Sequence, residues 1–369
     1  MIVYLVLFAA ILFAYVLTGY NANAKSKKHF LIICAILIIA VLGSRHNWYS
    51  FSDEGMYYLQ YEEAMRSTYD EFVNGGPKET RDVGYMVMVW CIAQVIPWPQ
   101  FILYLECAVV VCSYFYFVYK NTKNSLNAVL LFFGSGLLTF YMSAFRQGFA
   151  FALCLFAYQL FESAMNRQRG RLLRNVFAIL LFLIAITMHR SALVFLMVLI
   201  VQHIHVIWAK FAVTIGSSVL MFLFRDQLLE YGNEVTGSDY STGTAESLVG
   251  FVFQAIILIL PIVLLLLNSA FKERNRLFLR NDYLTAATTS VVGTAFYVIR
   301  LFSLVFERIA FFFSAFSLVI YDTTADYVFD KRTKTIFLYA VNLMSVLLFL
   351  YRVMTNRHGG AFTFFWQTK

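Results

Sequence analysis

Long apolar segments alternate with short polar ones along the whole chain. The longest approach or reach the roughly 20 residues that a helix needs to cross a bilayer. They cover residues 3–16, 30–42, 101–118, 176–188, 251–267 and 336–350. No segment alternates at every second residue, as the strands of a transmembrane barrel do. Because an open sheet in lipid would leave backbone groups unpaired, the pattern predicts an all-α polytopic membrane protein.

The composition supports the same class. Apolar residues make up 60% of the 369 residues and charged residues only 14%, which leaves too few polar side chains to cover a soluble globule. The first apolar run lacks a preceding basic region and a small-residue cleavage site, so we expect a retained helix rather than a signal peptide. The five cysteines lie inside apolar runs without a close pair or nearby histidines, so neither a disulfide nor a metal site is expected.

The charges are distributed unevenly between the loops. Five short loops are strongly basic, at residues 25–28, 120–123, 167–174, 272–280 and 331–334, and such loops mark the cytoplasmic side. The net charge of +8 therefore reflects topology rather than a nucleic-acid partner. Two longer loops have the opposite balance: residues 45–82 carry eight acids against four bases, and residues 225–249 carry five acids against Arg225 alone. We expect these two loops to face outward.

These assignments predict a single integral membrane domain over residues 1–369 with about twelve crossings. The first large outer loop, 45–82, is expected to contain short helices, and residues 225–249 form the second outer loop. Between the first outer loop and the next basic loop lie two apolar stretches, 83–98 and 101–118, where only an odd number of crossings fits. The first is short and ends in Pro97-Trp98-Pro99, so we expect a re-entrant or juxtamembrane helix that does not cross.

A set of cations is not explained by this topology. Its members lie near the predicted outer ends of helices: Arg45, Arg146, His189, Arg190, Arg300 and Arg308. Cations at membrane depth on the outer side are costly, which makes each of them a candidate functional residue. The alternative is that some extend to lipid phosphates, as long basic side chains do at membrane interfaces. The gathering of six on one predicted side favours a functional role.

Arginines that converge near the outer leaflet suit a pyrophosphate, because guanidinium stays charged and binds phosphate oxygens through paired hydrogen bonds. A lipid-linked pyrophosphate is the expected ligand. Gln147 follows Arg146 where an outer turn meets a long apolar helix, whose start adds positive potential for an anion. The candidate pyrophosphate-binding residues are Arg45, Arg146, Gln147, Arg190, Arg300 and Arg308.

The first outer loop supplies candidate groups for sugar chemistry. Asp53, Tyr57 and Tyr61 are spaced by four, which on a helix places one carboxylate and two phenols on a single face. A carboxylate that activates a hydroxyl, and aromatic rings that stack on sugars, are what glycosyl transfer requires. Asp53 is the preferred catalytic base, and Tyr57 and Tyr61 are the candidate sugar-binding residues. The alternative for Asp53 is a cap on the helix that follows it.

His189 is the second candidate catalytic residue. It interrupts an apolar run at its predicted outer end, beside Arg190. A histidine there suits proton transfer to the leaving group or hydrogen bonding to a phosphate. The alternative is a purely structural histidine.

In these residues the chain resembles the EpsG family of bacterial exopolysaccharide membrane proteins, which includes Wzy-type polysaccharide polymerases. The resemblance covers nearly the whole chain. The residues that carry it are Arg45, Asp53, Tyr57, Tyr61, Gly84, Tyr85, Arg146, Gln147, His189, Ser191, Ala192, Arg308 and the aromatic segment 311–316. Two features depart from the family pattern: Asp82 stands where a glutamate is more frequent, and Ser52 precedes Asp53 where a Gly-Thr pair is usual.

The resemblance implies a polymerase on the outer face of the bacterial cytoplasmic membrane. Such an enzyme moves a growing glycan from an undecaprenyl pyrophosphate carrier onto a second lipid-linked repeat unit. It also implies a GT-C-like glycosyltransferase architecture, with an acid of the first large outer loop in catalysis, a role that Asp53 fits. No cofactor is implied. The sequence leaves open the sugars joined, the stereochemistry of the linkage and whether a chain-length regulator binds.

Two other functions compete with this prediction. A membrane O-acyltransferase that modifies surface glycans has a similar length and also uses histidine and arginine, but an arginine and histidine constellation is expected in its first spans. Residues 1–40 contain only His29 and three lysines. A lipid-linked oligosaccharide flippase is expected to carry charges within its spans and an internal repeat, and the sequence contains no such repeat.

Overall fold

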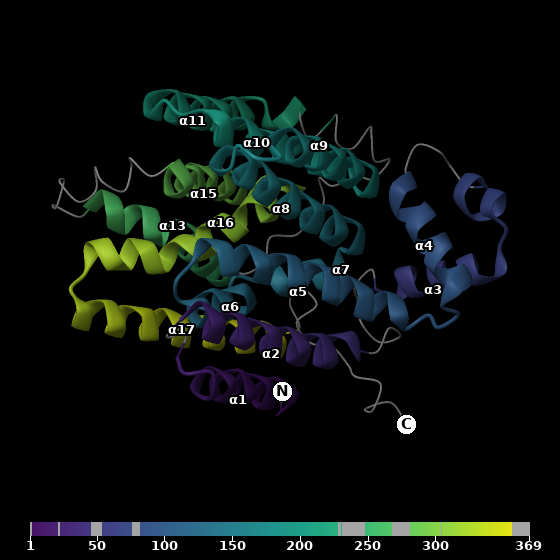
Figure 1. The fold of residues 1–369 in the computed structure, drawn as a ribbon, viewed down its shortest axis with the longest axis horizontal. Coiled ribbons are helices and arrows are strands. Elements are labelled where there is room, and N and C mark those ends of the chain that lie inside the picture. The colour runs from purple at the N-terminus through teal and green to yellow at the C-terminus, as the bar shows by residue number, and fades with distance from the viewer. Residues whose placement is uncertain are drawn as a thin grey trace. The chain divides into compact units, whose positions relative to one another are not determined.

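The computed structural model describes residues 2–20, 23–45, 54–75, 82–227, 230, 248–267, 281–303 and 305–355. Helices make up all the regular secondary structure of these residues, which contain no β-strand (Figure 1). The all-α prediction is therefore confirmed for the described part of the chain. The chain divides into two compact units: Met1–Ala192 with Ser345–Lys369, and Leu193–Met344.

The first unit is built around α5 (Phe101–Asn121), which packs against α2 (Ala24–Gly43) on one side and α8 (Phe145–Asn166) on another. Helix α1 (Ile2–Leu17) packs on α2, and α9 (Arg171–Met188) packs along α8. The Asn23 side chain caps α2 by accepting a hydrogen bond from the Ser26 amide, which satisfies a free donor of the first turn. These helices supply most of the apolar core of the unit.

A broken helix lies beside this core. Helix α6 (Ser125–Gly134) and helix α7 (Leu137–Ser143) meet at an angle of 55°. Gly136, between them, has a φ of +76°, a conformation that glycine adopts without steric cost. The Arg352 guanidinium, from the end of α17 (Lys331–Met354), donates to the Gly134 carbonyl at 2.8 Å and so satisfies a free acceptor at the end of α6.

Three short helices form a layer beyond one end of α5 (Figure 1). They are α3 (Glu54–Arg66), the π-helical turn η1 (Asp70–Asn74) and α4 (Val83–Val95), and α4 packs against both of the others. Their shared core contains Tyr57, Tyr61, Phe72, Tyr85 and Val89. Helix α4 also packs on α9, so this layer is fixed to the long helices of its own unit.

The second unit is organised around α16 (Val305–Val328), which is buried along most of its length. Helix α15 (Asn281–Ile299) lies along it, because Gly293 allows close approach: a Cβ there would be 2.8 Å from the Cβ of Phe313. Helix α13 (Leu248–Leu267) packs on α16, where the Tyr321 hydroxyl donates to the Ile257 carbonyl at 2.7 Å. Helices α10 (Leu196–His203) and α11 (Ile207–Leu223) pack against α15.

Five described helices are long and apolar enough to cross a membrane: α2, α5, α8, α9 and α17. The bent pair α6 and α7 raises the number to six if it forms one span. Shorter apolar helices, among them α1, α4 and α11, are below that length. The chain is therefore a helical membrane protein, and the expected twelve crossings exceed the spans that the described helices provide by length and composition. The sequence prediction placed a non-crossing segment at residues 83–98, where α4 is short, but it did not foresee the break between α6 and α7.

Candidate functional site

The Asp82 carboxylate lies at the centre of a charged cluster in the first unit. Its Oδ2 atom is 2.8 Å from Nδ1 of His189 and 3.1 Å from Nη1 of Arg146. Asp82 itself is only 7% exposed, whereas the side chains of Arg146 and His189 are 31% and 26% exposed. A buried carboxylate thus holds two partly accessible groups, one cationic and one able to transfer protons. We call these three residues the charged centre.

Each residue of the charged centre stands at a helix end. Asp82 directly precedes α4, Arg146 is the second residue of α8, and His189 directly follows α9. Helix ends leave backbone groups unpaired, so polar side chains gather there at little cost. The start of α8 also adds positive potential near Arg146, which favours an anionic ligand.

The packing of α4 on α9 sets the distance between Asp82 and His189. Gly84 lies two residues after Asp82, and Thr187 lies two residues before His189. A Cβ at Gly84 would be 2.2 Å from Oγ1 of Thr187 and 2.9 Å from its carbonyl carbon, too close for any side chain. Glycine is therefore required here for close approach of the two helices, which brings the carboxylate within hydrogen-bonding distance of the imidazole.

Aromatic side chains pack against the buried side of the charged centre. The Tyr57 phenol lies next to the Arg146 guanidinium, and the Tyr57 ring stacks on Phe145 with 4.5 Å between centroids. Tyr85 is fully buried, and its hydroxyl has no hydrogen-bond partner among the described residues. Nε of Arg146 is also buried and has no hydrogen-bond partner among the described residues. Unsatisfied buried polar atoms are rare in folded proteins, and here they lie next to a group suited to binding a ligand.

Arg45 has a different environment from the one expected. It is fully buried, and Nη2 lies 3.2 Å from Oε2 of Glu106 on α5. The guanidinium also donates to the carbonyls of Leu42 and Met142, and it lies over the Phe145 ring. These contacts tie the end of α2 to α5, to α7 and to the start of α8. They give Arg45 a structural role that does not need a phosphate.

The two tyrosines predicted to stack on sugars lie on one helix face, as their spacing predicted, but that face points inward. Tyr57 is 3% exposed and Tyr61 is fully buried. The Tyr61 hydroxyl donates to the Ile96 carbonyl at 2.8 Å, and burial raises the pKa of that phenol. Both rings pack in the core of the layer of short helices, so stacking on a sugar stays a prediction that requires one of these ring faces to become exposed.

The other candidate residues are dispersed. Gln147 is buried and Arg190 is exposed, both in the first unit. In the second unit, Arg300 is buried and lies 2.5 Å from Oε1 of Glu307, with the Tyr297 hydroxyl at 2.6 Å. Arg308 lies exposed on the first turns of α16. Asp53 and most of the second outer loop, 225–249, lie outside the described residues.

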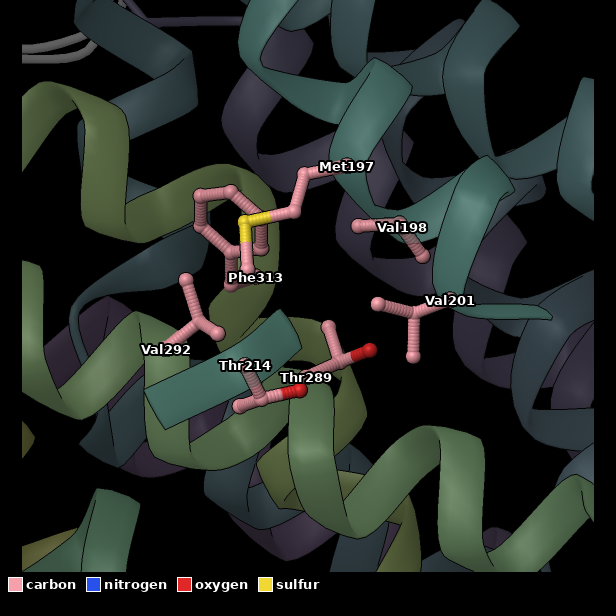
Figure 2. A pocket seen from close by; sticks show the side chains of 7 residues that line it. All are labelled: Met197, Val198, Val201, Thr214, Thr289, Val292 and Phe313. Carbon is pink, nitrogen blue, oxygen red and sulfur yellow. The ribbon is translucent and has the colours of Figure 1, made fainter. Parts of the chain in front are cut away.

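The second unit also contains a small pocket between α10, α11, α15 and α16 (Figure 2). Its lining is apolar apart from Thr214 and Thr289, and it leaves no room for even a water-sized ligand. Ligand sites usually offer roughly 300–1,000 Å³ with several polar groups, so this pocket is not a candidate substrate site. Among the described residues, no group of three or more His, Cys, Asp or Glu side chains is arranged to hold a metal ion.

Three residues that the structure makes prominent were not among the predicted site residues, although Asp82 and Tyr85 were named in the family resemblance. Asp82 is the centre of the cluster, Glu106 is the partner of Arg45, and Tyr85 is the buried phenol beside Arg146. Asp82 and Tyr85 flank Gly84, a glycine at an expected helix start, which is a sequence signal for close packing. Glu106 lies within an apolar run, and a lone acid at membrane depth predicts a paired cation.

Comparison with known proteins gives one match. No curated protein and no solved structure matches this chain. The sequence profile of the EpsG family matches residues 27–366, which include every residue of the charged centre. This confirms the resemblance noted in the sequence, and the chain belongs to the EpsG family.

Proposed function

We propose that this protein is a polysaccharide polymerase of the Wzy type. It transfers a growing glycan from undecaprenyl pyrophosphate to a second lipid-linked repeat unit, at the outer face of the bacterial cytoplasmic membrane. Membership of the EpsG family and the apolar helices support a role in polysaccharide synthesis at a membrane. In this proposal the chain has about twelve crossings and a GT-C-like architecture, with the layer of α3, η1 and α4 on the outer side.

One observation supports the proposal most strongly: the Asp82 carboxylate holds Arg146 and His189 together at the ends of membrane helices. Transfer from a lipid pyrophosphate needs a cation for the leaving group and a group that accepts the proton of the attacking hydroxyl. Arg146 is such a cation, and His189 is a group that can accept the proton. Both are partly exposed, which a group that meets a substrate must be.

Asp82 prepares His189 for proton transfer. When Nδ1–H of the imidazole donates to the carboxylate, the lone pair of the neutral ring lies on Nε2. In the proposed step, the hydroxyl oxygen of the acceptor sugar forms a bond to the anomeric carbon of the donor. The bond between that carbon and the pyrophosphate oxygen breaks, and the hydroxyl proton moves to Nε2. Asp82 stabilises the resulting imidazolium.

Arg146 holds the leaving pyrophosphate. Asp82 engages Nη1 and the Tyr57 phenol accepts a second bond, so of the five N–H groups of the guanidinium others remain to donate to phosphate oxygens. The start of α8 adds to the positive potential at the same point. Arg190, in the same unit, is proposed as a further phosphate contact, following the sequence prediction, which also named Arg300 and Arg308. Asp53 remains the alternative proton acceptor.

The direct test is synthesis by the purified full-length protein in liposomes supplied with a lipid-linked repeat unit. The expected result is a ladder of glycans that differ by one repeat unit. The His189→Ala variant should lose the ladder, while His203→Ala should keep it. His203 is a matched control because its Nδ1 also bonds near a helix end, but to the Leu199 carbonyl rather than to a carboxylate. Acyl transfer, or translocation of the lipid without a ladder, would contradict the proposal.

A further inference from the structure

The layer of short helices carries an aromatic pair that the proposed reaction does not use. Tyr69, just before η1, and Trp90, on α4, meet edge to face with 5.4 Å between centroids and an interplanar angle of 87°. Tyr69 is 41% exposed and Trp90 is partly exposed. We call Tyr69 and Trp90 the aromatic pair. They differ from Tyr57 and Tyr61, whose rings are buried in the same layer.

The surroundings of the aromatic pair are rigid. The Trp90 indole N–H donates to the Ser67 carbonyl at 3.1 Å, which fixes the ring and uses its polar atom. Glu71 accepts from the amide and the hydroxyl of Thr68, both at 2.8 Å, and these bonds lower the pKa of Glu71. The Asn74 amide donates to Asp70 at 2.9 Å. Tyr69 thus stands on a hydrogen-bonded turn, with its ring against a Trp90 ring whose indole N–H is itself bonded.

Exposed aromatic rings also occur at membrane interfaces, where Trp and Tyr anchor a protein among lipid headgroups. The charges nearby argue against that role. Residues 54–74 contain five acids, namely Glu54, Glu62, Glu63, Asp70 and Glu71, against Arg66 as the single base. An anionic lipid surface attracts basic segments and repels acidic ones. A neutral or amino sugar is compatible with these acids, because carboxylates accept hydrogen bonds from its hydroxyls.

The position of the aromatic pair suits the sugar part of a lipid-linked substrate. Trp90 lies on the same helix as Gly84 and eight residues beyond Asp82, a rise of about 12 Å along α4. A glycan whose pyrophosphate end lies at the charged centre therefore reaches the aromatic pair about 12 Å from that end. Asp70 and Glu71 each use one oxygen in the bonds described above, which leaves a second oxygen on each to accept from a sugar.

We propose that Tyr69 and Trp90 form a saccharide-binding subsite for the glycan part of the substrate. This inference rests on the proposed function, since it names the part of the substrate that this layer recognises. The ring of Tyr69 contributes its apolar face to the C–H groups of a sugar, and Asp70 and Glu71 orient the sugar hydroxyls. Removal of one aromatic contact of this kind should weaken sugar binding about 2- to 10-fold.

The test measures binding of a probe that has neither lipid nor pyrophosphate. The probe is the oligosaccharide repeat unit released by mild acid from the carrier lipid of the producing bacterium. Full-length protein in nanodiscs is titrated by saturation-transfer NMR. Tyr69→Ala should bind about 2- to 10-fold more weakly than wild type, and Tyr69→Phe, which keeps the ring, should bind like wild type. Tyr339→Ala is the matched control, because Tyr339 is 67% exposed on α17 and should not affect binding.

Two outcomes would overturn the inference. The first is equal binding by wild type and by a Tyr69→Ala variant that elutes as a single folded species. The second is absence of probe binding to the wild type, which would leave the aromatic pair as a membrane-interface anchor. Neither outcome bears on polymer synthesis, because the probe cannot be polymerised. Failure of the proposed function would be recognised separately, by absence of the glycan ladder in the liposome assay.

Discussion

Asp82 and His189 are 107 residues apart in the chain, yet the carboxylate of one accepts a 2.8 Å hydrogen bond from Nδ1 of the other. The bond joins the start of α4 to the end of α9. Gly84, two residues after Asp82, permits this contact, because its backbone packs directly against Thr187 of α9. The packing of two helices is therefore what orients the candidate catalytic imidazole.

Gly84→Ala should separate the two helices and weaken both stability and polymer synthesis. The added methyl would meet Thr187 at 2.2 Å, and overpacking of this kind costs about 1–3 kcal/mol. Thermal unfolding in detergent and the liposome assay measure the two effects. The Gly84→Ala/Thr187→Gly double variant should recover part of each. Gly216→Ala is the matched control, because no heavy atom lies within 4 Å of the added Cβ. Unchanged activity in Gly84→Ala would show that the contact between α4 and α9 does not determine the geometry of the charged centre.

Arg146→Ala should weaken binding of undecaprenyl pyrophosphate by about 10- to 150-fold, since a hydrogen bond to a charged group contributes roughly 1.5–3 kcal/mol. Lysine should restore only part of this affinity, because its ammonium cannot pair with phosphate oxygens through a planar fork. Fluorescence titration of the protein with the carrier lipid measures the affinity. Arg332→Ala, on the exposed start of α17, is the control. Wild-type affinity in Arg146→Ala would remove Arg146 from the binding site.

Arg45 and Glu106 should stabilise the protein as a pair rather than act on the substrate. Both side chains are fully buried, so Arg45→Met removes the cation from a buried carboxylate and should cost about 3–5 kcal/mol. The Arg45→Met/Glu106→Leu double variant should recover most of this stability and keep polymer synthesis. Arg225→Met, which breaks a partly exposed pair with Asp226, should cost at most about 1 kcal/mol. A folded double variant without activity would instead support Arg45 as a pyrophosphate ligand.

Asp330 should make the stability of the protein pH-dependent in the acid range. Its carboxylate caps α17 by accepting bonds from the Thr333 hydroxyl and the amides of Thr333 and Arg332, and these bonds lower the pKa of Asp330. Because the folded pKa is depressed, the stabilisation is present above the unfolded pKa of about 4 and is lost as the pH falls below it. Thermal unfolding of wild type and Asp330→Ala should therefore differ at pH 7, and the difference should shrink as the pH falls below about 4 and through the folded pKa of Asp330. A difference in unfolding temperature that stays constant across this pH range would show that the Asp330 carboxylate does not stabilise α17 as a cap.

The apolar pattern of the sequence predicted the helices well, because each apolar run of a membrane protein must be helical to pair its own backbone groups. The runs at residues 30–42, 101–118 and 176–188 lie within α2, α5 and α9. The break between α6 and α7 was missed although Gly134-Ser135-Gly136 marks it in the sequence. Hydropathy alone does not separate a broken helix from a continuous one.

The candidate site was predicted less completely than the fold. Arg146 and His189 were recognised because cations at membrane depth are costly, and the structure brings these two together on Asp82. The spacing of Tyr57 and Tyr61 predicted a shared face, but only the packing of α4 and α8 determines that this face is buried. The partner of Arg45 lies 61 residues away, and no local pattern reveals such a pairing.

The central claim is that Asp82 orients His189 to accept a proton while Arg146 holds the leaving pyrophosphate. Single-turnover transfer between two lipid-linked repeat units in liposomes tests it most directly, with Asp82→Asn, His189→Ala and the control His203→Ala. The account predicts that Asp82→Asn and His189→Ala each slow transfer about 100- to 10,000-fold, that His203→Ala matches wild type, and that His189→Ala still binds the lipid-linked substrate. Transfer at the wild-type rate by a folded His189→Ala variant would contradict the account and make Asp53 the next candidate for the proton acceptor.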